Sequence, residues 1–248
     1  DENDFWSDGA RNQIRQKNWQ CYRDGDDEAI MAAVTGWYDG DGNELMEQEI
    51  VFALIPLVGD EYVLEVQLTV HPGSSREKVS VGKTNFGFLA VRVAKSISEH
   101  FGGGKLSSSE GGVSEKEIFG KQARWVDYSG PVAIGSGQSR ITVTEGITYF
   151  DHPDNPRYPT YWHVRADGWM GASFGMHEGL VITREQPLTL RYLLYAHRGS
   201  HSHENAARQA QAFAQRSRFV VQESSKSHEQ FEVRRSPRPN GNVERNEN

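Results

Sequence analysis

The sequence predicts an all-β protein, an antiparallel β-sandwich with one helix near its C-terminal end. Three observations predict this class. Apolar and polar residues alternate in many segments, turn residues separate these segments, and only one long segment has helical periodicity. The chain has 248 residues with 25 Gly and 9 Pro, which is long enough to bury a core and typical of a turn-rich globular protein.

The segment 61–70, EYVLEVQLTV, shows the alternation most clearly. One face carries Tyr62, Leu64, Val66, Leu68 and Val70, and the other carries Glu61, Glu65, Gln67 and Thr69. This pattern predicts a strand with one buried face. We expect further strands at 28–38, 45–55, 86–94, 122–130, 140–150 and 188–197. Turns such as DGDGN at 39–43 favour antiparallel connections, and two packed sheets or a closed barrel are needed to bury so many apolar faces.

One helix is expected over 204–219, ENAARQAQAFAQRSRF. Its apolar stripe consists of Ala206, Ala210, Phe213 and Ala214, which would pack against a sheet. The segment 102–117 is rich in Gly and Ser and is expected to be a loop. Residues 1–222 are expected to form a single β-sandwich domain, and 223–248 a flexible tail, because the tail has few large apolar residues.

Composition excludes several classes of protein. The net charge is −7 and no Lys/Arg cluster is present, so nucleic acid is not an expected partner. No run approaches 18 apolar residues, so membrane insertion is not expected. Cys21 is the sole cysteine, which excludes an intrachain disulfide without fixing the compartment. Localisation and oligomeric state stay open, and a periplasmic or secreted location is favoured over the cytoplasm.

The segment 150–169, FDHPDNPRYPTYWHVRADGW, is the main candidate for a site. Pro153, Pro156 and Pro159 should stiffen the loop that precedes Thr160. From Thr160 the sequence alternates as a strand. Its polar face carries Tyr161, His163 and Arg165, and we expect this face to line an open cleft, because an unpaired buried charge is unfavourable.

These residue types suit a sugar or another small polar ligand. His152 and His163 titrate near neutrality and could act as general base and acid. Arg157 and Arg165 could hold an anionic group, and the rings of Tyr128, Tyr161 and Trp162 could stack on a sugar. An alternative interpretation makes the segment a structural corner, in which Arg157 and Arg165 pair with Asp151, Asp154 or Asp167.

Five blocks carry a resemblance to a known family. They are DFW at 4–6, GKTNFGFLAVRVA at 82–94, ARWVDYSG at 123–130, DHPDNPRYPTYWHVR at 151–165 and LRYLLYAHRG at 190–199. Together they resemble the soluble bacterial family labelled PmoA-like. The resemblance implies a β-sandwich, of which the aldose-epimerase-like supersandwich is one form, and relatives that often sit beside sugar oxidoreductases. Lys83, Asp127, Tyr128 and His197 lie in these blocks and are expected to join the ligand-binding residues.

The resemblance also implies a His-rich motif, similar to DHPHHRG, shortly before the DFW block. This chain begins with DENDFW, so we expect that part of the family domain to lie outside it. The family tends to have Glu at the position of Asn85, so an acid role there is not carried over.

The segment HSH at 201–203, with His197 upstream, is a second candidate, for a metal site. Two imidazoles on one face could bind a cation, but the sequence identifies no carboxylate to complete the set, so no metal and no other cofactor is expected. Three functions remain: a carbohydrate-active enzyme that uses His acid/base chemistry for epimerisation, elimination or a related proton transfer; a non-catalytic carbohydrate-binding module; and a metal-dependent oxygenase, as the family label suggests.

Overall fold

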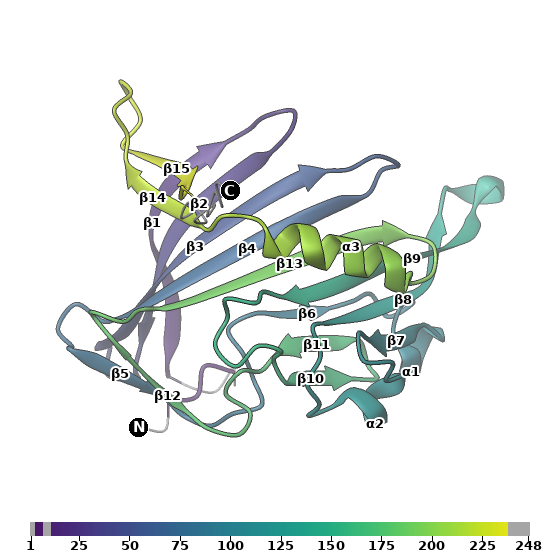
Figure 1. Cartoon of the computed structure of the whole chain (residues 1–248), viewed down its shortest axis with the longest axis horizontal. Helices are drawn as coiled ribbons and strands as arrows, with labels where there is room; N and C mark the ends of the chain where they lie inside the picture. The colour runs from purple at the N-terminus through teal and green to yellow at the C-terminus, as the bar shows by residue number, and fades with distance from the viewer. Residues whose placement is uncertain (1–2, 7–10, 238–248) are drawn as a thin grey trace, which may run out of the picture.

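The computed structural model describes residues 3–6 and 11–237, and it confirms an antiparallel β-sandwich (Figure 1). One large sheet forms the centre of the molecule, and its neighbouring strands are antiparallel. In spatial order its strands are β1 (Gln13–Arg23), β2 (Ala29–Tyr38), β3 (Glu44–Pro56), β4 (Tyr62–Pro72), β13 (Leu188–Arg198), β9 (Ile141–Asp151), β8 (Trp125–Ile134) and β7 (Lys105–Ser108).

Smaller elements cover one face of this sheet. They are the three-stranded sheet of β10 (Trp162–Arg165), β11 (Trp169–Ala172) and β6 (Ala90–Arg92), the pair β12 (Leu180–Thr183) and β5 (Lys78–Val81), and the short helices α1 (Glu99–Gly102) and α2 (Ser114–Ile118). A 3-10 turn, η1 (Gly137–Ser139), joins β8 to β9. The main core lies between these layers. Its largest buried side chains include Tyr128, Tyr149 and Trp162.

The opposite face is covered by α3 (His203–Ala214) and by the hairpin of β14 (Phe219–Glu223) and β15 (Phe231–Arg235). The expected helix is confirmed, although it ends at Ala214. Its buried residues Ala206 and Phe213 pack in one cluster with Trp125 and Phe150 of the sheet. Among the described residues, no helix has the length and apolar character needed to cross a membrane.

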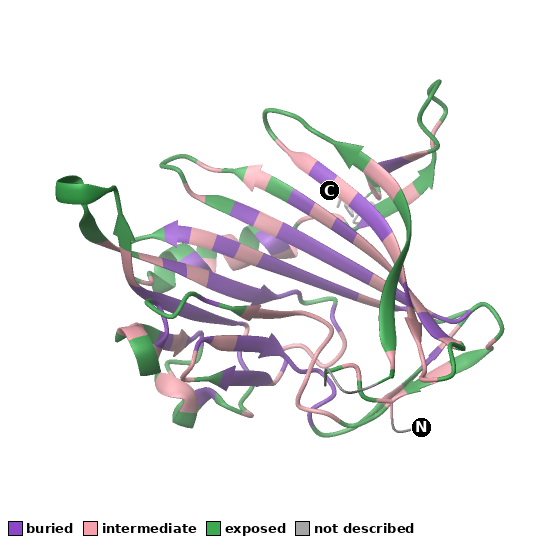
Figure 2. Ribbon diagram, turned by 180° about the vertical axis from the view of Figure 1, so that it is seen from behind, coloured by how far each residue is buried: buried purple, intermediate pink, exposed green. Residues whose placement is uncertain are grey.

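The expectation that β4 would have one buried face is wrong. Glu65 and Gln67, on its polar face, are buried together with Val66 and Leu68. Figure 2 shows that buried residues run along the middle strands of the large sheet. The hairpin after α3 covers this second face. There the side-chain amide of Gln67 donates a hydrogen bond to the Phe219 carbonyl and accepts one from the Phe219 N–H. Alternation predicted the strand correctly, but it could not show that a distant segment covers both sides.

Two expected loose segments are also partly ordered. In 102–117 the chain forms β7 and most of α2, and a Cβ on Gly104 would lie 1.7 Å from the Ile97 carbonyl oxygen, so this glycine allows a close approach of two backbones. In the expected tail, β15 pairs with β14 and buries Val233. Residues 238–248 of that tail lie outside the described residues. The expected strand at 86–94 is confirmed only over Ala90–Arg92.

Candidate functional site

The proline-rich loop between β9 and β10 is held by a buried polar anchor. The side chain of Asn155 donates 2.7 Å hydrogen bonds to the Asp151 carboxylate and to the carbonyl of Arg191, and it accepts one from the Arg191 amide. Asp151 also accepts a bond from the amide of Thr160. Burial raises the pKa of Asp151 to about 7, against the effect of these donors. The loop therefore has a fixed shape, including a cis peptide bond at Tyr158–Pro159.

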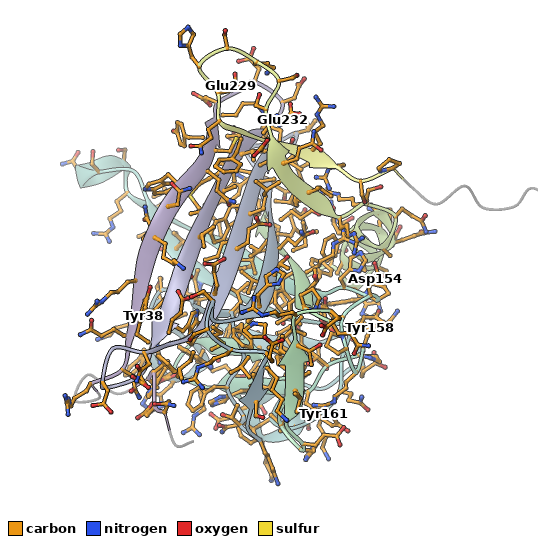
Figure 3. The ribbon with its side chains drawn as sticks, turned by 90° about the vertical axis from the view of Figure 1, so that its left-hand side faces the viewer. Tyr38, Asp154, Tyr158, Tyr161, Glu229 and Glu232 are labelled. Atoms are coloured by element: carbon orange, nitrogen blue, oxygen red, sulfur yellow. The ribbon has the colours of Figure 1, made fainter. Side chains whose placement is uncertain are left out.

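This loop forms one wall of a pocket of about 300 Å³, a size found among small-ligand sites. The pocket is lined by Gln122, Arg157, Tyr158, Tyr161, Phe174, His177 and Glu178. Figure 3 shows that Tyr158 and Tyr161 lie on the same side of the molecule. We call this cavity the tyrosine pocket. Two residues expected from the sequence, Arg157 and Tyr161, lie in it.

Arg157 fixes the wall of the tyrosine pocket. Its guanidinium donates to the carbonyls of Phe174, Glu178 and Gly179 at 2.8, 2.8 and 2.9 Å, and it lies 3.1 Å from the Glu178 carboxylate. The residue itself has a left-handed backbone, with φ of 63°. Most of its donors are therefore engaged by the segment 174–179, which fixes the charge in position beside the pocket.

Aromatic and titratable groups meet on the other side of the pocket. The rings of Tyr161 and His177 are edge to face, with centroids 4.3 Å apart. Gln122 donates from its side chain to the carbonyl of Pro159 at 2.8 Å and pairs with Tyr161 in an isolated β-bridge. The pocket thus combines phenol rings, an amide, an imidazole and a carboxylate, groups that can hydrogen-bond hydroxyls and pack on an apolar ring face.

His152, expected as a catalytic base, lies elsewhere. Its side chain is 1 % exposed, its Nδ1 accepts the backbone N–H of Asp154, and its ring packs edge-on against Phe213 of α3. Burial, followed by the positive charge of Arg191, lowers the pKa of His152 to about 4. This buried imidazole therefore lies beneath α3 and does not line the tyrosine pocket.

The expected open cleft beside His163 is wrong as well, since His163 is only 6 % exposed. Its ring is packed among the rings of Phe86, Phe119 and Trp169, and burial lowers its pKa. Arg165 is exposed and pairs with Glu115 at 3.4 Å. The rings of these three residues cover the part of the face that carries His163, while Arg165 on the same face stays in contact with solvent.

Three other expected ligand residues serve the core or the surface. Trp162 is fully buried and donates its indole N–H to the Ala123 carbonyl at 2.8 Å. Tyr128 is fully buried and donates its hydroxyl to the Arg165 carbonyl at 2.7 Å. Neither ring has a face for a ligand. Lys83 is exposed in the segment between β5 and β6 and does not line the tyrosine pocket.

Asp127 and His197 are brought together, but apart from the tyrosine pocket. The Nε2 atom of His197 lies 2.8 Å from the Asp127 carboxylate, and Nδ1 of His201 lies 3.4 Å from it. Burial raises the pKa of Asp127, but hydrogen bonds from the two histidines outweigh this effect and leave the pKa at about 2. Burial lowers the pKa of His197, and the bond with Asp127 outweighs it, so the pKa is raised.

Sequence reasoning missed most of the pocket lining. Tyr158 lies within the proline-rich segment, so that segment was a usable signal for it. Gln122, Phe174, His177 and Glu178 come from two other parts of the chain that carry no local motif. Only long-range packing brings them to the loop.

Residues 1–211 match a family of unknown function, DUF6807. The chain belongs to this family. Its match covers the large sheet, the proline-rich loop and most of α3, so both groups of polar residues described above lie inside the family domain. The sequence matches none of the curated proteins with which it was compared.

Proposed function

We propose that this protein is carbohydrate-active and binds a small sugar in the tyrosine pocket. The observation that carries the proposal is the lining itself: Tyr158, Tyr161 and Phe174 bring aromatic rings to a cavity that also has amide, imidazole and carboxylate groups. Sugars present both apolar C–H faces and hydroxyls, and this combination of side chains is suited to both.

The rigidity of the pocket supports the same proposal. Arg157 ties the loop that carries Tyr158 to the opposite wall through three carbonyl oxygens. A preformed wall lowers the entropy lost on binding, which matters for a small, weakly binding polar ligand. The resemblance to the PmoA-like family, whose relatives often sit beside sugar oxidoreductases, is a second line of support.

Proton transfer in the pocket would fall to His177 and Glu178. Both side chains line the cavity and are exposed to solvent, so each can exchange protons with a bound hydroxyl or with water. Arg157 lies 3.1 Å from the Glu178 carboxylate and holds it beside the pocket. We propose epimerisation, elimination or a related proton transfer as the reaction class, since these need acid and base groups alone.

The test is a ligand screen by saturation-transfer NMR with a panel of monosaccharides and disaccharides. The Tyr161→Ala variant should lose the transfer signal, because it removes a ring from the pocket wall. The matched control is Tyr22→Ala, since Tyr22 is 83 % exposed on β1 and does not line the pocket. Equal signals in the wild type and in Tyr161→Ala would contradict the proposal.

The His177→Ala variant separates the enzyme from the binding module. For an enzyme, the sugar that binds should be slowly altered by the wild type, and His177→Ala should bind it without altering it. Unaltered sugar with the wild type, after prolonged incubation, would favour the non-catalytic carbohydrate-binding module.

A further inference from the structure

Asp127 occupies an unusual position for a carboxylate, buried on β8, the strand next to the edge strand β7 of the large sheet. It lies on β8 opposite Thr148 of β9, and its side chain is fully buried. His197 comes from β13, on the far side of β9, and pairs in register with Gly146. A Cβ on Gly146 would lie 2.7 Å from the His197 ring, so the glycine makes the room that lets this imidazole lie across β9 toward Asp127.

His201 reaches the same carboxylate from another direction. It lies in the loop between β13 and α3, and its Nδ1 atom is 3.4 Å from Oδ2 of Asp127. The same oxygen also faces Nε2 of His197 at 2.8 Å and the hydroxyl of Thr148 at 2.7 Å. Three groups therefore converge on one oxygen atom, whereas a carboxylate oxygen has two lone pairs for hydrogen bonds.

We propose that Asp127, His197 and His201 form a binding site for a divalent transition-metal ion of the zinc class. Their ligand atoms all lie within 4.8 Å of one another. A cation about 2.0–2.2 Å from each atom would hold neighbouring ligand atoms roughly 3.4 Å apart, so the separations between the ligand atoms change by up to about 1.4 Å when the site forms. Two imidazoles and one carboxylate are a ligand set that first-row metals accept.

The surroundings of the three residues fit a metal site. His197 directs its other ring nitrogen, Nδ1, toward the Arg198 carbonyl at 3.4 Å, and hydroxyls of Ser129 and Thr148 hold the carboxylate. Such outer contacts orient metal ligands in proteins. The Nε2 atom of His201 is buried without a hydrogen-bond partner among the described residues, so few contacts fix its ring and little is lost when it turns to a cation.

A cavity of about 20 Å³ adjoins the cluster and leaves room for one further ligand such as water. His197, His201 and Thr148 are among its lining residues. His201 is 16 % exposed, which gives a route from solvent. The N-terminus of α3, capped by Ser202, borders the same cavity, and its partial positive charge opposes a cation. We therefore expect weaker binding than at a closed structural zinc site.

The experiment is calorimetric titration of the tag-free, EDTA-treated chain with ZnCl₂, and with CoCl₂ followed by visible absorption. The expected result is one equivalent of metal per chain, with a cobalt spectrum typical of nitrogen and oxygen ligands. His201→Ala should lower the affinity at least about tenfold, which is the smallest loss expected when even an outer-contact residue is removed. Asp127→Asn should lower it as well and keeps nearly the same side-chain volume.

The matched control is His203→Ala. His203 belongs to the same HSH sequence, but its ring is 6.5 Å from that of His201 and packs beside Trp125. Its removal should leave the affinity for both metals unchanged. Absence of metal binding by folded wild type would overturn the proposal, and so would equal affinity of the wild type and His201→Ala. Tyr161→Ala should bind zinc normally, so this proposal and the sugar proposal fail separately.

Discussion

The buried carboxylate of Glu65 gives the sharpest test of what stabilises the sandwich. Its side chain is 1 % exposed on β4, and it faces three guanidinium groups. The separations are 3.3 Å to Arg191, 3.1 Å to Arg216 and 2.9 Å to Arg235. These arginines come from β13, from the segment after α3 and from β15. Glu65 therefore joins the large sheet to the segments that cover its second face.

The Glu65→Gln variant keeps the shape of the side chain and removes its charge. Breaking a buried ion pair by removing one partner destabilises a protein by about 3–5 kcal/mol, because the remaining charge is left buried. Arg216 and Arg235 are 22 % and 31 % exposed and can turn toward water. Arg191 is 3 % exposed, but it retains Asp154 at 3.5 Å. We therefore expect a loss near the lower limit, about 3 kcal/mol.

The assay is urea denaturation at neutral pH, with the free energy of unfolding compared between the wild type and Glu65→Gln. The control is Glu204→Gln, which removes an exposed i,i+4 pair with Arg208 and should change that free energy by about 0.5 kcal/mol or less. A change below about 1 kcal/mol in Glu65→Gln would refute the reasoning, since it would mean that the remaining contact with Asp154 is enough to compensate the buried charge of Arg191.

The loss of stability in Glu65→Gln should depend on pH. Burial raises the pKa of Glu65, but hydrogen bonds and charge from Arg235 and Arg216 outweigh it, so the pKa lies below its ordinary value of 4.5. The carboxylate therefore adds stability above the pKa of the unfolded chain, and this contribution is lost as pH falls through the lower folded value. The difference between the wild type and Glu65→Gln should narrow below about pH 4.

Two further predictions concern other buried positions. His152 has a folded pKa of about 4 against 6.5 in the unfolded chain, so its contribution to stability should fall by about 3 kcal/mol as pH drops from 6.5 to 4. Measured as the difference between the wild type and His152→Gln, this trend is free of the opposing effect of Asp151, and a flat difference would contradict it. Gly87→Ala places a Cβ 1.9 Å from the Ala172 carbonyl oxygen and should destabilise by more than about 2 kcal/mol. In the control Gly82→Ala the added Cβ meets nothing within 4 Å, so the free energy of unfolding, measured by thermal melting, should change by no more than about 1 kcal/mol. Similar melting temperatures of the two variants would contradict the prediction, because they would show that the structure relaxes around the contact at Gly87.

The strands that the sequence predicts correctly are those whose alternation is strong and local. Residues 28–38, 45–55, 61–70, 140–150 and 188–197 correspond to β2, β3, β4, β9 and β13, with every end within two residues. The expected strand at 122–130 corresponds to β8, which begins and ends further along the chain, at Trp125 and Ile134. The polar edge strand β1 and the short strands β5, β11 and β12 escape this reasoning. Their segments are charged or too short to show a period, and pairing with a neighbour makes them strands.

The residues of the candidate site also divide into those that the local sequence predicts and those that distant contacts place. Arg157 and Tyr161 were predicted because prolines stiffen the loop that holds them, and they do line the tyrosine pocket. His152 and His163 lie close to them in sequence, yet packing against Phe213 and among aromatic rings buries both. Closeness in the sequence therefore does not determine which way a side chain points or how exposed it is.

Local sequence patterns predict the fold class, the position of the long helix α3 and the loop that forms the pocket wall. These properties follow from alternation, helical periodicity and proline restriction, which act over a few residues. No local pattern shows that a hairpin covers the second face of β4 or that Asp127 meets His197 and His201. Each depends on contacts between residues distant in the chain, which form only when the sheet orders its strands and the segments beyond it pack.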